Sequence, residues 1–114
     1  YGMDWNEDTI TKALATSVSL KLENVTFICG DYRSTAKTWN KPVDILHIDG
    51  DHDYNSVMDD FSAWVKHVRP GGVIMFHDID AFPEGPGKVF DMIAWPKWCY
   101  HDHCGLGIVC RPYE

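Results

Sequence analysis

The chain has 114 residues, of which 45% are hydrophobic and 24% are charged, as in ordinary globular domains. Its formal net charge of -7 at pH 7 argues against a nucleic-acid backbone or an anionic membrane as the main partner. No apolar run reaches the roughly 20 residues of a membrane span and no signal peptide is recognisable, so we expect a soluble, cytoplasmic chain. A single domain over residues 1–114 is expected, and formation of a homo-oligomer would help to stabilise so short a chain. The four cysteines lack the paired spacing of a secreted scaffold and are expected to be reduced.

The N-terminal third predicts two short strands, each followed by an acid. The first strand ends at Asp4, after which Asn6 can cap a helix with apolar residues at helical spacing. Residues 24–29 predict the second strand, and a turn carries the chain from it to Asp31. Residues 32–42 are polar and predict a loop or a single helical turn.

The segment from Val43 to Asp80 predicts one β-α-β unit. Residues 43–48 and 73–76 are short, β-branched apolar runs bounded by turn signals, as expected of strands covered on both faces. A right-handed crossover brings the carboxyl ends of both strands to the same edge of the sheet, where open α/β sheets bind ligands. That edge then carries acids and imidazoles: Asp49, Asp51, His52 and Asp53 from the first strand, and His77, Asp78 and Asp80 from the second.

The crossover between these strands predicts an amphipathic helix. Asp53 or Asn55 can cap its start, and Pro70 with the two glycines after it can stop it. An apolar stripe at helical spacing must face the sheet. The stripe consists of Val57, Met58, Phe61, Trp64, Val65 and Val68.

The C-terminal third predicts a loop, a helix and a hairpin. Residues 81–87 are rich in Pro and Gly and border the acidic edge, where the loop could act as a lid. Residues 88–95 predict a short helix. Residues 97–101 and 107–111 predict an antiparallel hairpin at the end of an otherwise mostly parallel sheet. The sequence therefore indicates an α/β fold.

Carboxylates from the two adjacent strand ends predict a divalent metal site. Asp49, Asp78 and His77 are placed to meet across a few ångströms, and such a set suits Mg²⁺, with Mn²⁺ or Ca²⁺ as substitutes. In the competing interpretation these acids cap the following helix and loop and stay solvated. Residues 49–53 also resemble the start of an EF-hand loop, but that loop requires Gly at its sixth position, where this chain has Tyr54.

His52 is the candidate general base, because its unperturbed pKa is near neutrality and it lies three residues beyond Asp49. The alternative is an ordinary hydrogen bond from the imidazole to backbone at the helix start. Farther along, the run from Cys99 to Cys104 (CYHDHC) has zinc-ligand residue types. Its spacing differs from that of common zinc fingers and favours a plain hairpin.

The segment ILHIDGDHDYNSVMDDFSAWVKHVRPGGVIMFHDID resembles class I S-adenosylmethionine-dependent methyltransferases. The pattern I-D-G-D-H-x-Y, a helix, and R-P-G-G-x-x-x-x-H-D is similar to that of their metal-assisted branch, which includes macrolide sugar O-methyltransferases and cephalosporin-hydroxylase-like proteins. The resemblance implies a Rossmann-like methyltransferase sheet with a C-terminal antiparallel hairpin. The family's first strand and Gly-rich turn would precede Tyr1, so the chain resembles the C-terminal two-thirds of such a fold and is expected to be N-terminally truncated.

The resemblance also implies roles for individual residues. Asp49, His77 and Asp78 would hold the metal, Mg²⁺ or Mn²⁺, and His52 would take the proton of the acceptor hydroxyl. Asp4 would bind the ribose of S-adenosylmethionine, and Asp31 with Tyr32 would lie beside its adenine.

Three functions remain open on this basis. The leading one is a metal-assisted O-methyltransferase that acts on a hydroxyl of a small molecule or sugar. The second is a non-catalytic, truncated metal- or nucleotide-binding module, or one that self-associates. The third is a hydrolase that uses the same Asp/His metal site without a cofactor. Binding of S-adenosylmethionine separates the first from the others.

Overall fold

The computed structural model describes residues 1–113. It divides into two compact units, Tyr1–Thr38 and Trp39–Glu114, and we describe each unit by itself. The expectation of a single domain stays a prediction.

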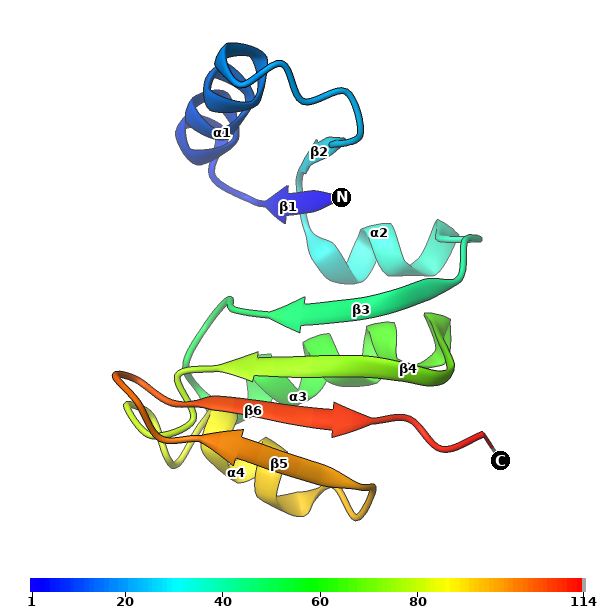
Figure 1. Ribbon diagram of the computed structural model, residues 1–114, viewed down its shortest axis with the longest axis vertical. Coiled ribbons are helices and arrows are strands. Elements are labelled where there is room, and N and C mark those ends of the chain that lie inside the picture. Colours follow the sequence, from blue (N-terminus) through cyan, green and yellow to red (C-terminus); the bar gives the residue numbers. More distant parts are fainter. Residues whose placement is uncertain (114) are drawn as a thin grey trace. The chain divides into compact units, whose positions relative to one another are not determined.

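The N-terminal unit is a two-stranded parallel sheet with two helices (Figure 1). Its strands pair in register, with Met3 opposite Ile28. Both strands were predicted, and the structure confirms them, although the second is shorter than expected. The elements are β1 (Gly2–Asp4), α1 (Glu7–Ser19), β2 (Phe27–Cys29) and α2 (Tyr32–Thr38).

The structure agrees with the prediction for the start of α1 and differs from it in the burial of α1 and in the length of α2. Asn6 caps α1 as predicted, accepting from the backbone N–H groups of Asp8 and Thr9. The apolar face of α1 is not covered, however, since Val18 is 68% exposed and Ser17 is the one buried residue of the helix. Of the two alternatives predicted for residues 32–42, a loop or a single helical turn, the structure has the helical one, and the helix is longer than one turn, with seven residues.

The C-terminal unit is a four-stranded mixed sheet with the strand order β3-β4-β6-β5. β3 and β4 are parallel, while the β4–β6 and β6–β5 pairs are antiparallel, which confirms the β-α-β unit and the closing hairpin (Figure 1). The elements are β3 (Val43–Ile48), α3 (Tyr54–Trp64), a 3₁₀ turn (Val65–His67), β4 (Val68–His77), α4 (Pro86–Met92), β5 (Lys97–Tyr100) and β6 (Leu106–Cys110).

The crossover helix ends before the end of the apolar stripe that predicted it, and the next strand begins before residue 73, where it was expected. α3 stops at Trp64, and β4 already starts at Val68, so that Pro70 lies inside a strand. The pairing of β3 with β4 shifts register between Val43 and Ile45, and such irregularities are where a sheet accepts proline and glycine. The helix α4 likewise begins inside the Pro/Gly-rich segment, with Pro86 in its first turn, where proline is favoured.

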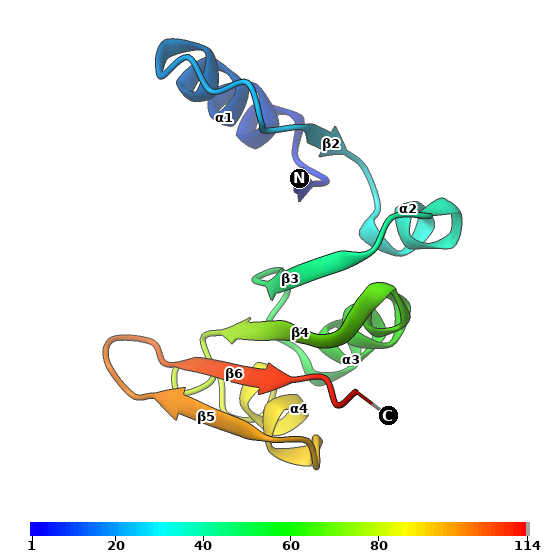
Figure 2. The same ribbon diagram turned by 45° about the vertical axis from the view of Figure 1, so that its right-hand side comes forward.

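The core of this unit lies between the sheet and its two helices. α3 and α4 lie on the same side of the sheet, behind it in Figure 1 and to its right in Figure 2. Ile74 and Phe76 of β4 and Val109 of β6 point to that side and are fully buried. The stripe of α3 faces the sheet as predicted, with Val57 and Trp64 buried. The full core cluster is Ile48, Val57, Val68, Ile74, Phe76, Ile79, Val89, Phe90 and Val109.

All four cysteines are free thiols in the structure. The helices in the described part of the chain are too short and too polar to cross a membrane.

Candidate metal and active site

The carboxyl ends of β3 and β4 bring together four residues that the sequence singled out. Asp49 follows β3 directly, and His77 is the last residue of β4. The Nε2 of His52 lies 2.9 Å from Oδ2 of Asp78. The Nδ1 of His77 lies 2.8 Å from Oδ1 of Asp78 and 3.4 Å from Oδ1 of Asp49. The predicted convergence of the two strand ends is therefore present.

The segment after Asp78 fixes the imidazole of His52. The ring of Phe82 stacks on it with centroids 3.8 Å apart and planes inclined by 10°. Behind it, a Cβ built on Gly85 would come 1.8 Å from the carbonyl oxygen of His52, so only glycine permits this approach. Sequence reasoning missed both residues and interpreted their loop as a lid. In the structure the loop packs against His52 and leads into α4.

Asp78 is the most enclosed carboxylate of the site, with a side chain that is 12% exposed. Its backbone lies in the left-handed region at φ 63°, and its N–H donates to the carbonyl of Gly105. Burial favours the neutral carboxyl group, but the neighbouring imidazoles of His77 and then His52 stabilise the carboxylate more. The pKa of Asp78 is therefore lower than that of an ordinary aspartate.

Three side chains of this site each offer one ligand atom at separations that a single cation can bridge. The ligand atoms of Asp49, His52 and Asp78 all lie within 4.8 Å of one another. In addition, Nδ1 of His77 is buried and has no partner with hydrogen-bond geometry among the described residues, although it faces two carboxylates. Buried polar atoms normally have a bonding partner, and a cation bound between the imidazole and the two carboxylates would supply one for this nitrogen. The donor set therefore fits a divalent metal.

The proposed cofactor residues lie in the N-terminal unit. Asp4 is the last residue of β1 and Asp31 lies two residues after the end of the parallel strand β2, at the same edge of their sheet, and Tyr32 begins α2. Oδ1 of Asp4 accepts from the N–H of Asn6 at 2.7 Å.

The Asp31 carboxylate starts α2. It accepts from the backbone N–H of Arg33 at 3.0 Å and from the hydroxyl of Ser34 at 3.1 Å. These bonds, that from Arg33 first, hold the pKa of Asp31 below its usual value. Asp31 thus has a structural role whether or not a nucleotide binds.

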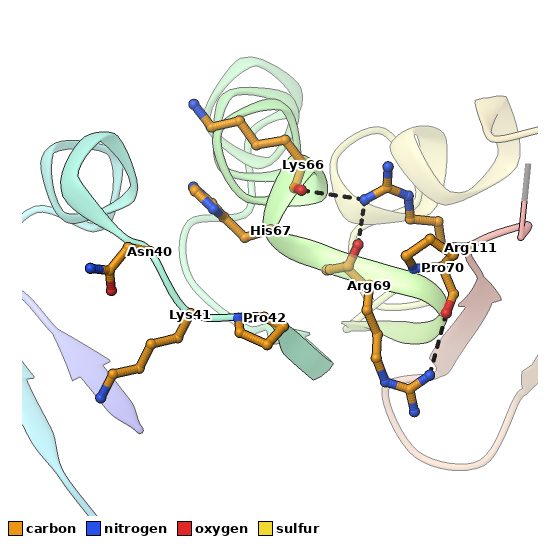
Figure 3. Close-up of a pocket in the computed structure, with 9 residues that line it drawn as sticks. Asn40, Lys41, Pro42, Lys66, His67, Arg69, Pro70 and Arg111 are labelled. Carbon is orange, nitrogen blue, oxygen red and sulfur yellow. Dashed lines mark hydrogen bonds between the residues drawn. The ribbon is translucent and has the colours of Figure 1, made fainter.

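A cavity of about 420 Å³ lies at the other end of β4 and is lined by basic side chains (Figure 3). Lys41, Lys66 and Arg69 border it, and Arg111 donates to the carbonyl oxygens of Val65, Lys66 and Val68. The Arg69 guanidinium is also paired with Asp44. None of the predicted site residues lines this cavity, so it is separate from the acidic edge.

The parallel β-α-β unit, the closing antiparallel hairpin and the polar strand-end cluster define an α/β protein of the class I methyltransferase type. Residues 1–79, more than half of the chain, match the family described as a methyltransferase domain. The chain belongs to that family, and the resemblance to class I methyltransferases is confirmed at this level.

Solved structures share the fold at low sequence identity. A methyltransferase from Geobacter sulfurreducens has a TM-score of 0.79 and 13% identity, with 96% of this chain and 56% of that chain covered. The SAH-bound methyltransferase PaMTH1 of Podospora anserina has a TM-score of 0.76 and 12% identity, with 98% of this chain and 59% of that chain covered. The uncharacterised protein y4gI of Sinorhizobium fredii is 38% identical over 56 residues, which are 49% of this chain and 6% of that protein. The chain thus spans well under two thirds of the length of these relatives.

Proposed function

We propose that the chain is part of an O-methyltransferase that transfers a methyl group from S-adenosylmethionine to a hydroxyl of a small molecule or sugar, assisted by Mg²⁺ or Mn²⁺. Membership of the methyltransferase domain family supports the reaction class. The observation that carries the metal assignment is the convergence of the ligand atoms of Asp49, His52 and Asp78 within 4.8 Å of one another, with Nδ1 of His77 beside the two carboxylates.

Asp49, Asp78 and His77 would hold the cation. Two carboxylates suit Mg²⁺ and Mn²⁺, and an imidazole is better tolerated by Mn²⁺. When bound, the cation supplies a Lewis acid that stabilises negative charge on the acceptor oxygen. The pKa of Asp78 is shifted below that of an ordinary aspartate, which favours the ionised form that binds a cation.

His52 would accept the proton of the acceptor hydroxyl. The ionised carboxylate of Asp78 can only accept a hydrogen bond, so Nε2 of His52 carries the hydrogen in this pair. In neutral imidazole the lone pair then resides on Nδ1, which is free to take a proton. Phe82 fixes the plane of the ring. The pair has the base-and-orienting-carboxylate arrangement that proton transfer requires.

The cofactor would use the strand-end acids of the N-terminal unit. In the described residues a single hydrogen bond is donated to the carboxylate of Asp4, which leaves its second oxygen for a ribose hydroxyl. We assign Asp31 and Tyr32 to the adenine side by the family resemblance. SAH in the Podospora anserina relative is the product that S-adenosylmethionine leaves after methyl transfer, which supports the choice of cofactor.

The acceptor is assigned by charge. A net charge of -7 disfavours a polyanionic partner such as a nucleic acid, whose phosphates bind basic surfaces. A neutral hydroxyl compound meets no such repulsion at the acidic edge.

Calorimetry and a transfer assay test the proposal together. S-adenosylmethionine is titrated into the protein with Mn²⁺ or with EDTA, and transfer of labelled methyl groups to a panel of sugars and phenols is followed. We expect cofactor binding in both conditions and transfer only with the metal. Binding without any transfer across the panel, or equal transfer in EDTA, would contradict the metal-assisted mechanism.

A self-associating module is the second candidate, and the end strand of the C-terminal sheet, as the described residues have it, favours it. β3 is the end strand of that sheet, and its Ile45 is 63% exposed. An apolar, unpaired strand edge is a template for pairing with another chain. Sedimentation of residues 1–114 should show a concentration-dependent dimer if this candidate holds, with no heat of S-adenosylmethionine binding.

A further inference from the structure

Outside the acidic edge, three side chains form a hydrogen-bonded chain that the proposed reaction does not use. The Sγ of Cys99 lies 3.3 Å from Nε2 of His101. The other ring nitrogen of His101, Nδ1, lies 2.9 Å from Oδ2 and 3.1 Å from Oδ1 of Asp80. A thiol, an imidazole and a carboxylate are thus connected in this order.

The fold brings these residues together from two separate segments. Cys99 lies in β5 and His101 follows that strand, whereas Asp80 lies beyond the end of β4. The hairpin turn is fastened to the Asp80 segment, because the N–H groups of Asp80 and Ala81 both donate to the carbonyl of Cys104. The turn also requires Gly105, at φ 84°, where a Cβ would come 2.7 Å from the Asp80 carboxylate. The two segments are therefore held in fixed contact.

Cys99 lies on the helix-facing side of β5. The neighbouring Lys97, two residues earlier and on the same face, donates to the carbonyl oxygens of Phe90 and Asp91 in α4. Cys99 is half-buried and packs against the core cluster, while His101 is exposed to solvent. Cys99 is thus held against the core and is partly accessible to solvent, beside an exposed imidazole.

The hydrogen bonds determine the direction of proton transfer. A carboxylate only accepts, so Nδ1 of His101 carries the hydrogen that points to Asp80. The lone pair of the neutral imidazole is then on Nε2, which faces the thiol of Cys99. This is the order of nucleophile, base and orienting group that activates a cysteine.

The same geometry argues against a shared zinc ion. His101 contacts Cys99 with one ring nitrogen and Asp80 with the other, and a single ion binds only one nitrogen of an imidazole. In the described residues, the group with metal-site spacing is the one at the acidic edge. The zinc ligand types in the CYHDHC run therefore have another use.

We propose that Cys99 is a nucleophilic thiol that exchanges with low-molecular-weight disulfides. His101 takes the proton of Cys99, and the thiolate attacks one sulfur of the disulfide. A bond forms between Sγ and that sulfur while the original S–S bond breaks. The departing thiolate takes the proton back from His101, so that one disulfide and one thiol are consumed and one of each is produced. Asp80 is a positioning residue that orients His101.

The first test compares cysteines within one molecule. The 114-residue chain is treated briefly with iodoacetamide at pH 7, and modified sites are located by tandem mass spectrometry. Cys104, which is exposed in the same hairpin turn, serves as the internal control. An unassisted cysteine is only a few per cent thiolate at this pH, so half-buried Cys99 should still react at least about threefold faster than Cys104. A rate equal to or below that of Cys104 overturns the proposal.

Two variants separate activation from loss of structure. His101→Asn and Asp80→Asn should each slow Cys99 relative to Cys104 by about threefold or more. A merely loosened hairpin would expose Cys99 and speed its reaction, so the sign of the change distinguishes the two causes. Unchanged or faster reaction of Cys99 in His101→Asn contradicts its role as the base, and the same result in Asp80→Asn contradicts the orienting role.

The second test uses oxidised glutathione as the disulfide. One glutathione should be added to Cys99 before any is found on Cys29, Cys104 or Cys110, and a thiol reductant should remove it. Rapid alkylation of Cys99 without formation of this mixed disulfide would overturn the exchange reaction. These readouts need no methyl transfer, so they are independent of the function proposed above.

Discussion

His52 and Asp78 are 26 residues apart in the chain, yet the imidazole Nε2 and a carboxylate oxygen meet at 2.9 Å. The contact joins the carboxyl ends of two parallel strands, and the aromatic ring of Phe82 stacks on the imidazole. A change on either strand end is therefore expected to alter the chemistry of the other.

Replacing Asp49 by Asn should weaken binding of Mn²⁺ or Mg²⁺ at least tenfold, about 1.4 kcal/mol, in calorimetry. The physical reason is the loss of one anionic ligand that faces His77 and Asp78. Asp51→Asn is the matched control. It removes the same charge only two residues along the chain, and the Asp51 side chain does not belong to the cluster of ligand atoms. If both variants bind the metal as the parent chain does, Asp49 is not a ligand.

The variant His52→Ala should lower kcat for methyl transfer by about 10²- to 10⁴-fold if His52 is the base. Affinities for the metal and for S-adenosylmethionine should change little, because Asp49, His77 and Asp78 remain. His103→Asn is the control, as it removes an imidazole in the hairpin turn at φ 55°, a conformation that asparagine accepts. A large loss of metal affinity in His52→Ala would show instead that this imidazole is a ligand.

The variant Gly85→Ala should destabilise the chain by about 1–3 kcal/mol in urea unfolding, because the new Cβ collides with the carbonyl of His52. In the folded fraction the Phe82 ring should also leave His52, which is detectable as a change in the imidazole chemical shifts. Glu84→Ala, in the same exposed loop, should stay within about 0.5 kcal/mol. Equal stabilities of the two variants would refute the close approach.

The pKa of Asp31 in the folded chain should be below its unfolded value, and Ser34→Ala should raise it part of the way back. The bond from the N–H of Arg33 is the larger cause and remains in this variant. Because the folded pKa is depressed, the stabilising contribution is present above about pH 4 and is lost as the pH falls through the folded pKa. NMR titration of the Asp31 carboxyl carbon measures both values. A folded pKa at or above the ordinary one would contradict the two bonds.

Local patterns in the sequence determined most of the elements and the residues at the strand ends. The β-branched runs, the apolar stripe of α3 and the cap at Asn6 each depend on neighbours within a few residues, so they could be read directly. The positions of Asp49, His77 and Asp78 followed from the parallel crossover, which has a nearly fixed hand.

Patterns failed where tertiary pairing overrode local preference. Pro70 reads as the end of a helix, but pairing with β3 and an irregular register make it part of β4. The polar segment after Asp31 indicates a loop or at most a single helical turn, but the Asp31 carboxylate accepts two hydrogen bonds at the start of α2 and a seven-residue helix forms.

The finer geometry of both side-chain clusters was decided by the tertiary structure alone. Phe82 reaches His52 because the segment after β4 folds back over the loop that follows β3, and no spacing in the sequence encodes that return. Asp80 reaches His101 because the hairpin turn accepts hydrogen bonds from the Asp80 segment. The sequence by itself determined which chemical groups stand at the ends of the strands. Only the packing of loops, through contacts between residues distant in the chain, decided which of these groups touch.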